Sequence, residues 1–204
     1  MLEAIDLSAR RGSLLLFSRL RLRVEAGRAL VVTGRNGSGK TTLLRILAGL
    51  THAEEGRVMW NGATIAPHDA GMRAQCVFAG HAPSLKDELT VEENLRSLTA
   101  LAGEHASDDA ISESLAAVDM IDQRALPARV LSQGQRRRVG LARLSLLPRA
   151  LWLLDEPATA LDTTGLASLV KLVAQRLREG GSVVAATHQA LELPVERVDT
   201  MAMA

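Results

Sequence analysis

The sequence predicts an α/β protein with a parallel sheet at its core, antiparallel strands near the N-terminus and an inserted α-helical lobe. Three observations lead to this fold class. The apolar runs at 29–33, 150–155 and 182–187 have the length and composition of buried parallel strands. The first of them runs into a glycine-rich loop that opens a helical stretch. The pattern over 90–122 is helical, so helices are expected to interrupt the series of strands.

The first half of the chain supplies most of the expected strands. Residues 20–34, "LRLRVEAGRALVVTG", contain two strands separated by a Glu-Ala-Gly turn. Residues 40–50, "KTTLLRILAGL", predict a helix with a glycine near its end. Residues 56–65 predict a hairpin around an Asn-Gly pair, and residues 75–80, "QCVFAG", predict another strand. We therefore expect a single domain, 1–204, with a helical subdomain at about 82–147.

Composition narrows the function. The 24 Lys and Arg nearly balance the 23 Asp and Glu, which argues against a general nucleic-acid binder. Aromatic residues make up only 2%, so stacking platforms for single strands are scarce. The single cysteine, Cys76, excludes an internal disulfide framework and suits a reducing compartment. No apolar run approaches the roughly 18 residues of a membrane span, so we expect a soluble chain.

The glycine-rich loop predicts a nucleoside triphosphate site. "GRNGSGKT" matches G-x-x-x-x-G-K-[ST] after a strand and before a helix, the context that this motif requires. Lys40 is expected to reach the β- and γ-phosphates, and Thr41 to place its hydroxyl on Mg²⁺. An ordinary turn with a solvated lysine is the alternative, and the eight matching positions disfavour it. The expected nucleotide contacts are Gly34, Arg35, Asn36, Gly37, Ser38, Gly39, Lys40, Thr41 and Thr42.

The strand "LWLLD" ends in two adjacent acids, where parallel sheets bind their ligands. Asp155 is placed to hold Mg²⁺ through water. Glu156 is a candidate base for an attacking water. A helix-capping Asp with an exposed Glu is the alternative, which the nearby phosphate loop makes less favourable.

A second phosphate grip lies far along the chain. "LSQGQRRRVGLARL" predicts a Ser-Gly turn that opens a basic helix, a shape suited to an anion. One nucleotide cannot easily occupy both loops of a small domain, so the turn at 132–134 is expected to grip a nucleotide bound to another subunit. The arginines at 136–138 are interpreted as a solvated or subunit-facing surface, with nucleic-acid binding as the weaker alternative.

Taken together, these motifs resemble the nucleotide-binding subunits of ABC transporters over essentially the whole chain. "GRNGSGKT" resembles the Walker A loop, "LSQGQ" the LSGGQ signature, and "LWLLDEP" Walker B. "TALD" at 159–162 resembles the D-loop, and His188 in "AATHQ" the switch histidine. The order and spacing of all five agree, which implies the P-loop NTPase (RecA-like) core of the ABC ATPase fold.

The resemblance also implies a mechanism. Two subunits would meet head to tail as a homodimer, each signature turn closing over ATP held by the other. Ser132 and the N–H of Gly134 would contact the γ-phosphate, and Gln135 belongs to the same site. His188 would hold the γ-phosphate and the water, while Asp162 would signal across the interface. The expected catalytic residues are thus Lys40, Glu156 and His188.

The chain departs from the family pattern in three places. The signature has Gln133 where glycine is usual, although its neighbours carry the contacts. The aromatic expected to stack on adenine is missing, and Arg10 or Arg11 stands near its place, either over the base or in solvent. His81 replaces a glutamine that senses Mg²⁺, so it is included with Thr41 and Asp155 in the expected metal site, although imidazole suits Mg²⁺ poorly.

"GHAPSLKDELT", "SQGQRRRVGLARL" and "THQ" resemble the ATP-binding subunits of bacterial cytochrome c maturation (haem exporter) transporters. This implies two integral membrane partners, a peripheral place on the cytoplasmic face of the inner membrane, and ATP hydrolysis that drives haem export or releases a haem-loaded chaperone. Haem would be handled by the partners; the chain's other histidines are expected at the surface. A transporter for a metal or lipid, or a soluble non-transport ABC ATPase, remains an alternative; a GTPase is disfavoured because no N-K-x-D motif occurs.

Overall fold

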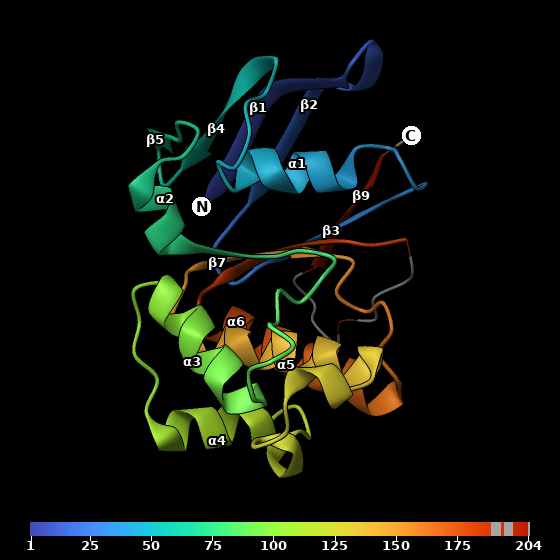
Figure 1. Ribbon diagram of the computed structural model, residues 1–204. Helices are drawn as coiled ribbons and strands as arrows, with labels where there is room; N and C mark the ends of the chain where they lie inside the picture. The colour runs from blue at the N-terminus through green and yellow to red at the C-terminus, as the bar shows by residue number, and fades with distance from the viewer. Residues whose placement is uncertain (189–192, 194–197, 204) are drawn as a thin grey trace. The chain divides into compact units, whose positions relative to one another are not determined.

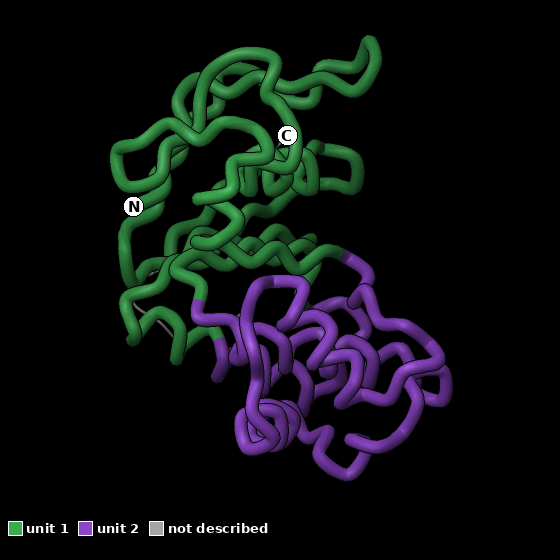
Figure 2. The backbone as a smooth tube through the Cα atoms, turned by 60° about the vertical axis from the view of Figure 1, so that its left-hand side comes forward, with its two compact units in different colours: residues 1–80, 149–157, 173–204 green, residues 81–148, 158–172 purple. Residues whose placement is uncertain are grey.

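The computed structural model describes residues 1–188, 193 and 198–203. Within them the chain forms two compact units (Figure 2). The sheet unit comprises residues 1–80, 149–157 and 173–204. The helical unit comprises residues 81–148 and 158–172.

A five-stranded parallel sheet forms the centre of the sheet unit. Its order is β6-β7-β8-β3-β9, and every neighbouring pair is parallel. All five residues of β7 and of β8 are buried, as expected for strands covered on both faces. The strands are β3 (Ala29–Gly34), β6 (Cys76–Ala79), β7 (Leu151–Asp155), β8 (Ser182–Ala186) and β9 (Val198–Met203).

A four-stranded antiparallel sheet, in the order β2-β1-β4-β5, forms the second layer of the same unit. Register shifts interrupt the pairing of β1 with both β2 and β4. Such bulges bend and twist a strand. The strands are β1 (Leu2–Arg11), β2 (Leu14–Val24), β4 (Glu55–Trp60) and β5 (Ala63–Thr64).

Helix α1 (Lys40–Leu47) lies between the two sheets (Figure 1). Its buried face joins side chains of β1, β3, β7 and β8 in one apolar core, which includes Leu2, Leu43, Leu47 and Leu153. Burying a leucine side chain contributes roughly 1.5–3 kcal/mol. This packing fixes the N-terminus of α1, and with it the glycine-rich loop that precedes the helix. The short helix α2 (Ala70–Gln75) leads into β6.

The helical unit is built from well-capped helices. Thr90 and Glu93 form a reciprocal capping box at the start of α3, and Ser107 caps α4. The elements are α3 (Val91–Leu101), α4 (Asp108–Ala116), η1 (Ile121–Gln123), η2 (Ala128–Val130), α5 (Gln133–Leu146) and the first ten residues of α6 (Thr163–Arg178).

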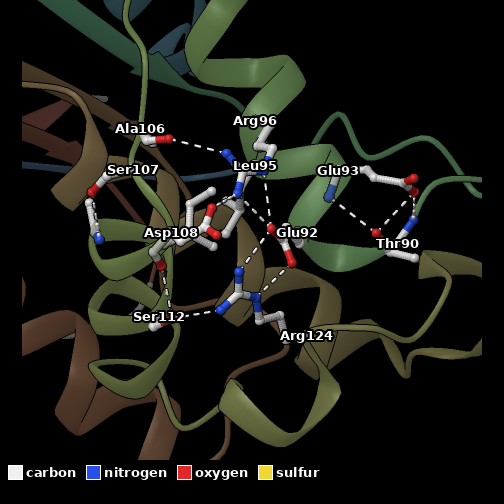
Figure 3. Close-up of polar contacts among 12 residues, drawn as sticks. Thr90, Glu92, Glu93, Leu95, Arg96, Ala106, Ser107, Asp108, Ser112 and Arg124 are labelled. Carbon is white, nitrogen blue, oxygen red and sulfur yellow. Dashed lines mark hydrogen bonds and ion pairs between the residues drawn. The ribbon is translucent and has the colours of Figure 1, made fainter.

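An ion-pair network ties the helices of this unit together (Figure 3). Glu92 of α3 accepts hydrogen bonds from Arg124 Nε at 2.6 Å and from Arg96 Nη2 at 2.7 Å. Arg96 also pairs with Asp108 at the start of α4, and Arg124 Nη1 donates to Ser112 Oγ at 2.7 Å. The two guanidinium groups hold the pKa of Glu92 at about 2, with Arg124 the larger cause.

The predicted fold class is confirmed: a parallel core, N-terminal antiparallel strands and a helical portion. The expected hairpin over 56–65 is β4 and β5. Strands β1 and β9 and helices α2 and α6 lay outside the sequence-based prediction. Among the described residues, no helix is both long and apolar enough to cross a bilayer.

Candidate functional site: a nucleotide-binding and hydrolysis centre

The glycine-rich loop connects β3 to α1 within the sheet unit. Gly37 and Gly39 have φ values of 87° and 98°, a left-handed region that favours glycine. A Cβ at Gly39 would lie 3.1 Å from Leu16 Cβ, so the loop also passes tightly against β2. The hydroxyl of Ser38 is buried and has no hydrogen-bond partner among the described residues. An orphaned hydroxyl inside a turn of this kind fits an anion acceptor.

Lys40, the first residue of α1, is buried although it is charged, with 6% of its side chain exposed. Its ammonium donates to the carbonyls of Gly34 at 2.7 Å and Arg35 at 3.1 Å. It also lies 3.9 Å from Glu156 Oε1. The loop backbone therefore holds this cation at the N-terminus of α1, where the helix dipole also favours anions.

Thr41 and Asp155 lie side by side. Thr41 Oγ1 donates to the Asp155 carboxylate at 2.9 Å, and Asp155 ends β7 almost fully buried. Hydroxyl and carboxylate oxygens are ligands that suit Mg²⁺, which usually takes one or two protein carboxylates and completes its shell with phosphates and water. The donor set therefore fits Mg²⁺.

Glu156 and His188 meet above the end of the parallel sheet. Glu156 follows β7 with a φ of 49°, and its N–H donates to the carbonyl of Ala186 at 2.8 Å. Its Oε2 lies 2.8 Å from His188 Nδ1. A positive φ in a non-glycine residue is a strained conformation, of the kind found where a side chain must be aimed. The carboxylate is 15% exposed, enough to be reached by water.

The sheet unit thus brings Lys40, Thr41, Asp155, Glu156 and His188 close together in one centre. Of the other loop residues, Arg35, Asn36 and Gly37 are exposed, while Thr42 is half-buried in α1. His81, the third expected metal ligand, belongs to the helical unit.

Helix α5 begins at the turn for which the sequence predicts a second phosphate contact. Ser132 is the N-cap of α5: its Oγ accepts from the N–H of Gln135, and the Gln135 side chain accepts from the N–H of Ser132 at 2.9 Å. A Cβ at Gly134 would lie 2.9 Å from the carbonyl oxygen of Ala160, so only glycine fits without displacement. The turn is exposed at Ser132 and Gln133, which leaves it accessible to a ligand.

The interpretation of the arginine run as a solvated surface is wrong for Arg137 and Arg138, while the alternative of a subunit-facing surface stays a prediction. Arg137 is buried, with 6% exposed, and its Nη1 donates to the carbonyl of His81 at 2.8 Å. Arg138 pairs with Asp119 and, at 2.5 Å, with Asp162. This pairing lowers the pKa of Asp162. Residues three and four apart share a helix face, but adjacent residues point in different directions, so a run of charges cannot all face solvent.

His81 lies at the edge of a cavity of about 250 Å³ inside the helical unit. The cavity is lined by His81, Ala82, Pro83, Gln133, Arg136, Arg137, Thr159 and Ala160. Two of the three departures from the family pattern, His81 and Gln133, therefore face the same space.

The two candidates for the missing adenine platform differ. Arg10 forms an ion pair with Glu54, with Arg10 Nε 3.3 Å from Glu54 Oε2, and its Nη1 donates to the carbonyl of Ser13. Arg11 is exposed at the end of β1. The apolar side chains that actually pack beside the glycine-rich loop are Leu16 and Phe17. The signal in the sequence that could have identified them is the continuous apolar run "LLLF" at 14–17.

Comparisons with known proteins agree with this geometry. The ABC transporter family model matches residues 17–159. The chain is 50% identical to the cytochrome c biogenesis ATP-binding export protein CcmA of Aromatoleum aromaticum, over 93% of this chain and 89% of that protein. It is 43% identical to the Pseudomonas aeruginosa protein of that name, over 98% and 99% of the two chains.

Among solved structures, an ABC transporter ATP-binding protein of Pyrococcus furiosus superposes with a TM-score of 0.86 at 26% identity, covering 99% of this chain and 96% of that one. A dimeric bacterial ABC transporter cassette shares the fold, with a TM-score of 0.85 at 22% identity, covering 99% and 94%. The chain belongs to the ABC transporter family, among the cytochrome c biogenesis ATP-binding export proteins.

Proposed function

We propose that this chain is the ATP-hydrolysing subunit of a cytochrome c maturation transporter, coupling hydrolysis to haem export or to release of a haem-loaded chaperone. The observation that carries the ATPase proposal is the meeting of Lys40, the Thr41–Asp155 pair and the Glu156–His188 pair in one centre. The relatives' names, which specify cytochrome c biogenesis and export, support the choice of transporter.

In the proposed reaction the glycine-rich loop holds the phosphates of ATP. Residues Gly34 to Thr42 turn backbone N–H groups toward them, and Lys40 leaves its carbonyl partners for the β- and γ-oxygens. Thr41 and Asp155 would hold Mg²⁺, which would supply positive charge to neutralise the phosphates.

Glu156 acts as general base. Its carboxylate accepts a proton from water while the water oxygen attacks the γ-phosphorus, and the bond to the β-γ bridging oxygen of ADP breaks. His188, hydrogen-bonded to Glu156, orients that carboxylate and holds the γ-phosphate. The strained backbone at Glu156 keeps the carboxylate at the open end of the sheet.

The signature turn completes the site in a head-to-tail homodimer. Ser132, Gly134 and Gln135 of one subunit would contact the γ-phosphate of ATP held by the other. Two features support this: the turn lies in a different compact unit from the phosphate loop, and its N-cap hydroxyl is exposed. Asp162, fixed by Arg138, would carry the signal between subunits, and His81 would reach the metal through water.

The whole chain, 1–204, acts in this proposal as one ABC ATPase domain with a helical subdomain at about 82–147. It would sit at the cytoplasmic face of the bacterial inner membrane, bound to two integral membrane subunits. Haem would be handled by those partners, as the similarity to the cytochrome c biogenesis export proteins suggests.

The first test is purification of the tagged chain from its own membranes in a gentle detergent. Co-purifying proteins are identified by mass, and the sample is scanned for haem absorption. Two small polytopic subunits with a haem-carrying partner are the expected result. A different permease without haem would keep the ATPase and reject the cytochrome c assignment; ribosomes or DNA without membrane subunits would reject transport altogether.

A further inference from the structure

We propose that Arg137 is a positioning residue for ATP turnover: it fixes the segment 81–83 against the signature helix α5. The inference rests on the proposed ATPase function. Arg137 lies five residues after the signature serine, yet its side chain contacts a segment more than 50 positions earlier in the sequence.

Two independent contacts hold the segment 81–83 on α5. The Arg137 guanidinium donates to the His81 carbonyl at 2.8 Å, and it is buried, so the bond is protected from water. One turn further along α5, Gly140 leaves room for Pro83. A Cβ at Gly140 would lie 2.8 Å from Pro83 Cβ, so the proline ring rests against the helix backbone.

The clamped segment has a particular place in the chain. Residue 80 is the last of the first stretch of the sheet unit, and His81 is the first residue of the helical unit. The catalytic centre belongs to the sheet unit and the signature turn to the helical unit. Segment 81–83 is therefore a covalent link between them, and Arg137 ties that link to the helix that the signature turn opens.

The Arg137–His81 hydrogen bond and the Gly140–Pro83 contact together form what we call the clamp. The effect of removing it follows from the burial of the Arg137 guanidinium. A buried guanidinium is retained when it makes hydrogen bonds that other side chains cannot make, because the desolvation of a charge is expensive. Lysine keeps the charge and N–H donors but loses the planar guanidinium fork, whereas methionine keeps only the apolar length. The clamp thus predicts a graded series, with Arg137→Lys between wild type and Arg137→Met.

The test measures both the segment and the reaction, in the full chain with its membrane partners. Hydrogen exchange of a peptide spanning 81–86 is expected to become at least about tenfold faster in Arg137→Met, because the loss of one hydrogen bond to a charged group corresponds to a factor of about ten or more. The kcat for ATP is expected to fall about tenfold while KM stays within twofold, because the phosphate loop is untouched.

Gly140→Ala attacks the same clamp from the Pro83 side and is expected to give the same two changes. Arg129→Met is the control: this arginine is exposed on η2 and its loss removes the same charge. Unchanged exchange over 81–86 in Arg137→Met would overturn the clamp. Faster exchange with an unchanged kcat would overturn its link to turnover. If the wild-type complex hydrolysed no ATP, the proposed function would fail, while the exchange experiment would still decide the clamp.

Discussion

Glu156→Gln tests the catalytic centre most directly. The amide keeps the shape of the side chain, and its oxygen can still accept the hydrogen bond that His188 Nδ1 makes at 2.8 Å. It cannot accept a proton from water. Loss of a positioned general base typically costs about 10²–10⁴ in rate. This corresponds to about 3–5 kcal/mol in the barrier, so kcat should fall by that factor.

The affinity for ATP, unlike the rate of hydrolysis, should not fall in Glu156→Gln. Glu156 Oε1 lies 3.9 Å from the Lys40 ammonium, and both side chains are largely buried. At an effective dielectric constant of about 20, such charges attract by up to about 4 kcal/mol. The carboxylate competes with phosphate for Lys40, so its neutralisation should leave the Kd for ATP unchanged or lower. The variant is therefore expected to trap ATP.

The assay is phosphate release at saturating ATP, with binding followed by a fluorescent ATP analogue. Glu113→Gln serves as the matched control, because Glu113 is exposed on α4, in the other unit. Turnover by Glu156→Gln within twofold of the wild-type rate would show that this carboxylate is not the base.

Three further predictions concern other parts of the molecule. Gly134→Ala should displace the signature turn from Ala160, because the new Cβ would lie 2.9 Å from the Ala160 carbonyl oxygen. The variant should have a lower kcat, with an unfolding temperature within a few degrees of wild type. A variant with normal turnover would contradict this. Glu92 has its pKa held at about 2 in the folded chain, below the ordinary 4.5, so its ion pairs stabilise the protein above pH 4.5 and are lost as the pH falls toward 2. Glu92→Gln should remove about 1 kcal/mol or less at pH 7, measured by urea unfolding, and the difference from wild type should shrink in acid; a difference that grows in acid would refute the assignment. Burial raises the pKa of the Cys76 thiol to about 11, which leaves little of the reactive thiolate at pH 8. Alkylation at pH 8 should therefore be at least on the order of 100-fold slower in the folded chain than in the unfolded chain. Equal rates would contradict the burial of Cys76.

The sequence predicted the centre of the fold well because local patterns determine it. The parallel strands are short apolar runs, and the phosphate loop has its motif between a strand and a helix. Strand β9 is different, since "VDTMAM" mixes polar and apolar residues and gains its place only by pairing with β3. Its assignment depends on a partner far away in sequence, which propensity alone does not identify.

The same distinction explains what was missed in the candidate site. Lys40, Thr41, Asp155 and Glu156 follow from two contiguous motifs, so sequence was sufficient to name them. The burial of Arg137 depends on a carbonyl 56 residues earlier, to which it donates. No local pattern distinguishes such an arginine from the arginines beside it in the sequence. Buried charges with long-range backbone partners are therefore the residues that sequence analysis is least able to assign.

The structure also changes the interpretation of His81 and Gln133, two residues at which the chain differs from the usual ABC motifs. The sequence pattern alone treats them as independent changes, His81 as a change in the metal site and Gln133 as a change in the turn that contacts phosphate. Both line the same cavity of about 250 Å³: His81 belongs to the segment that Arg137 anchors, and Gln133 belongs to α5, the helix that carries Arg137. Side chains that share a cavity do not contribute additively. A larger residue at 133 and an imidazole at 81 must therefore be accommodated together, and neither can be judged functional or neutral without the other.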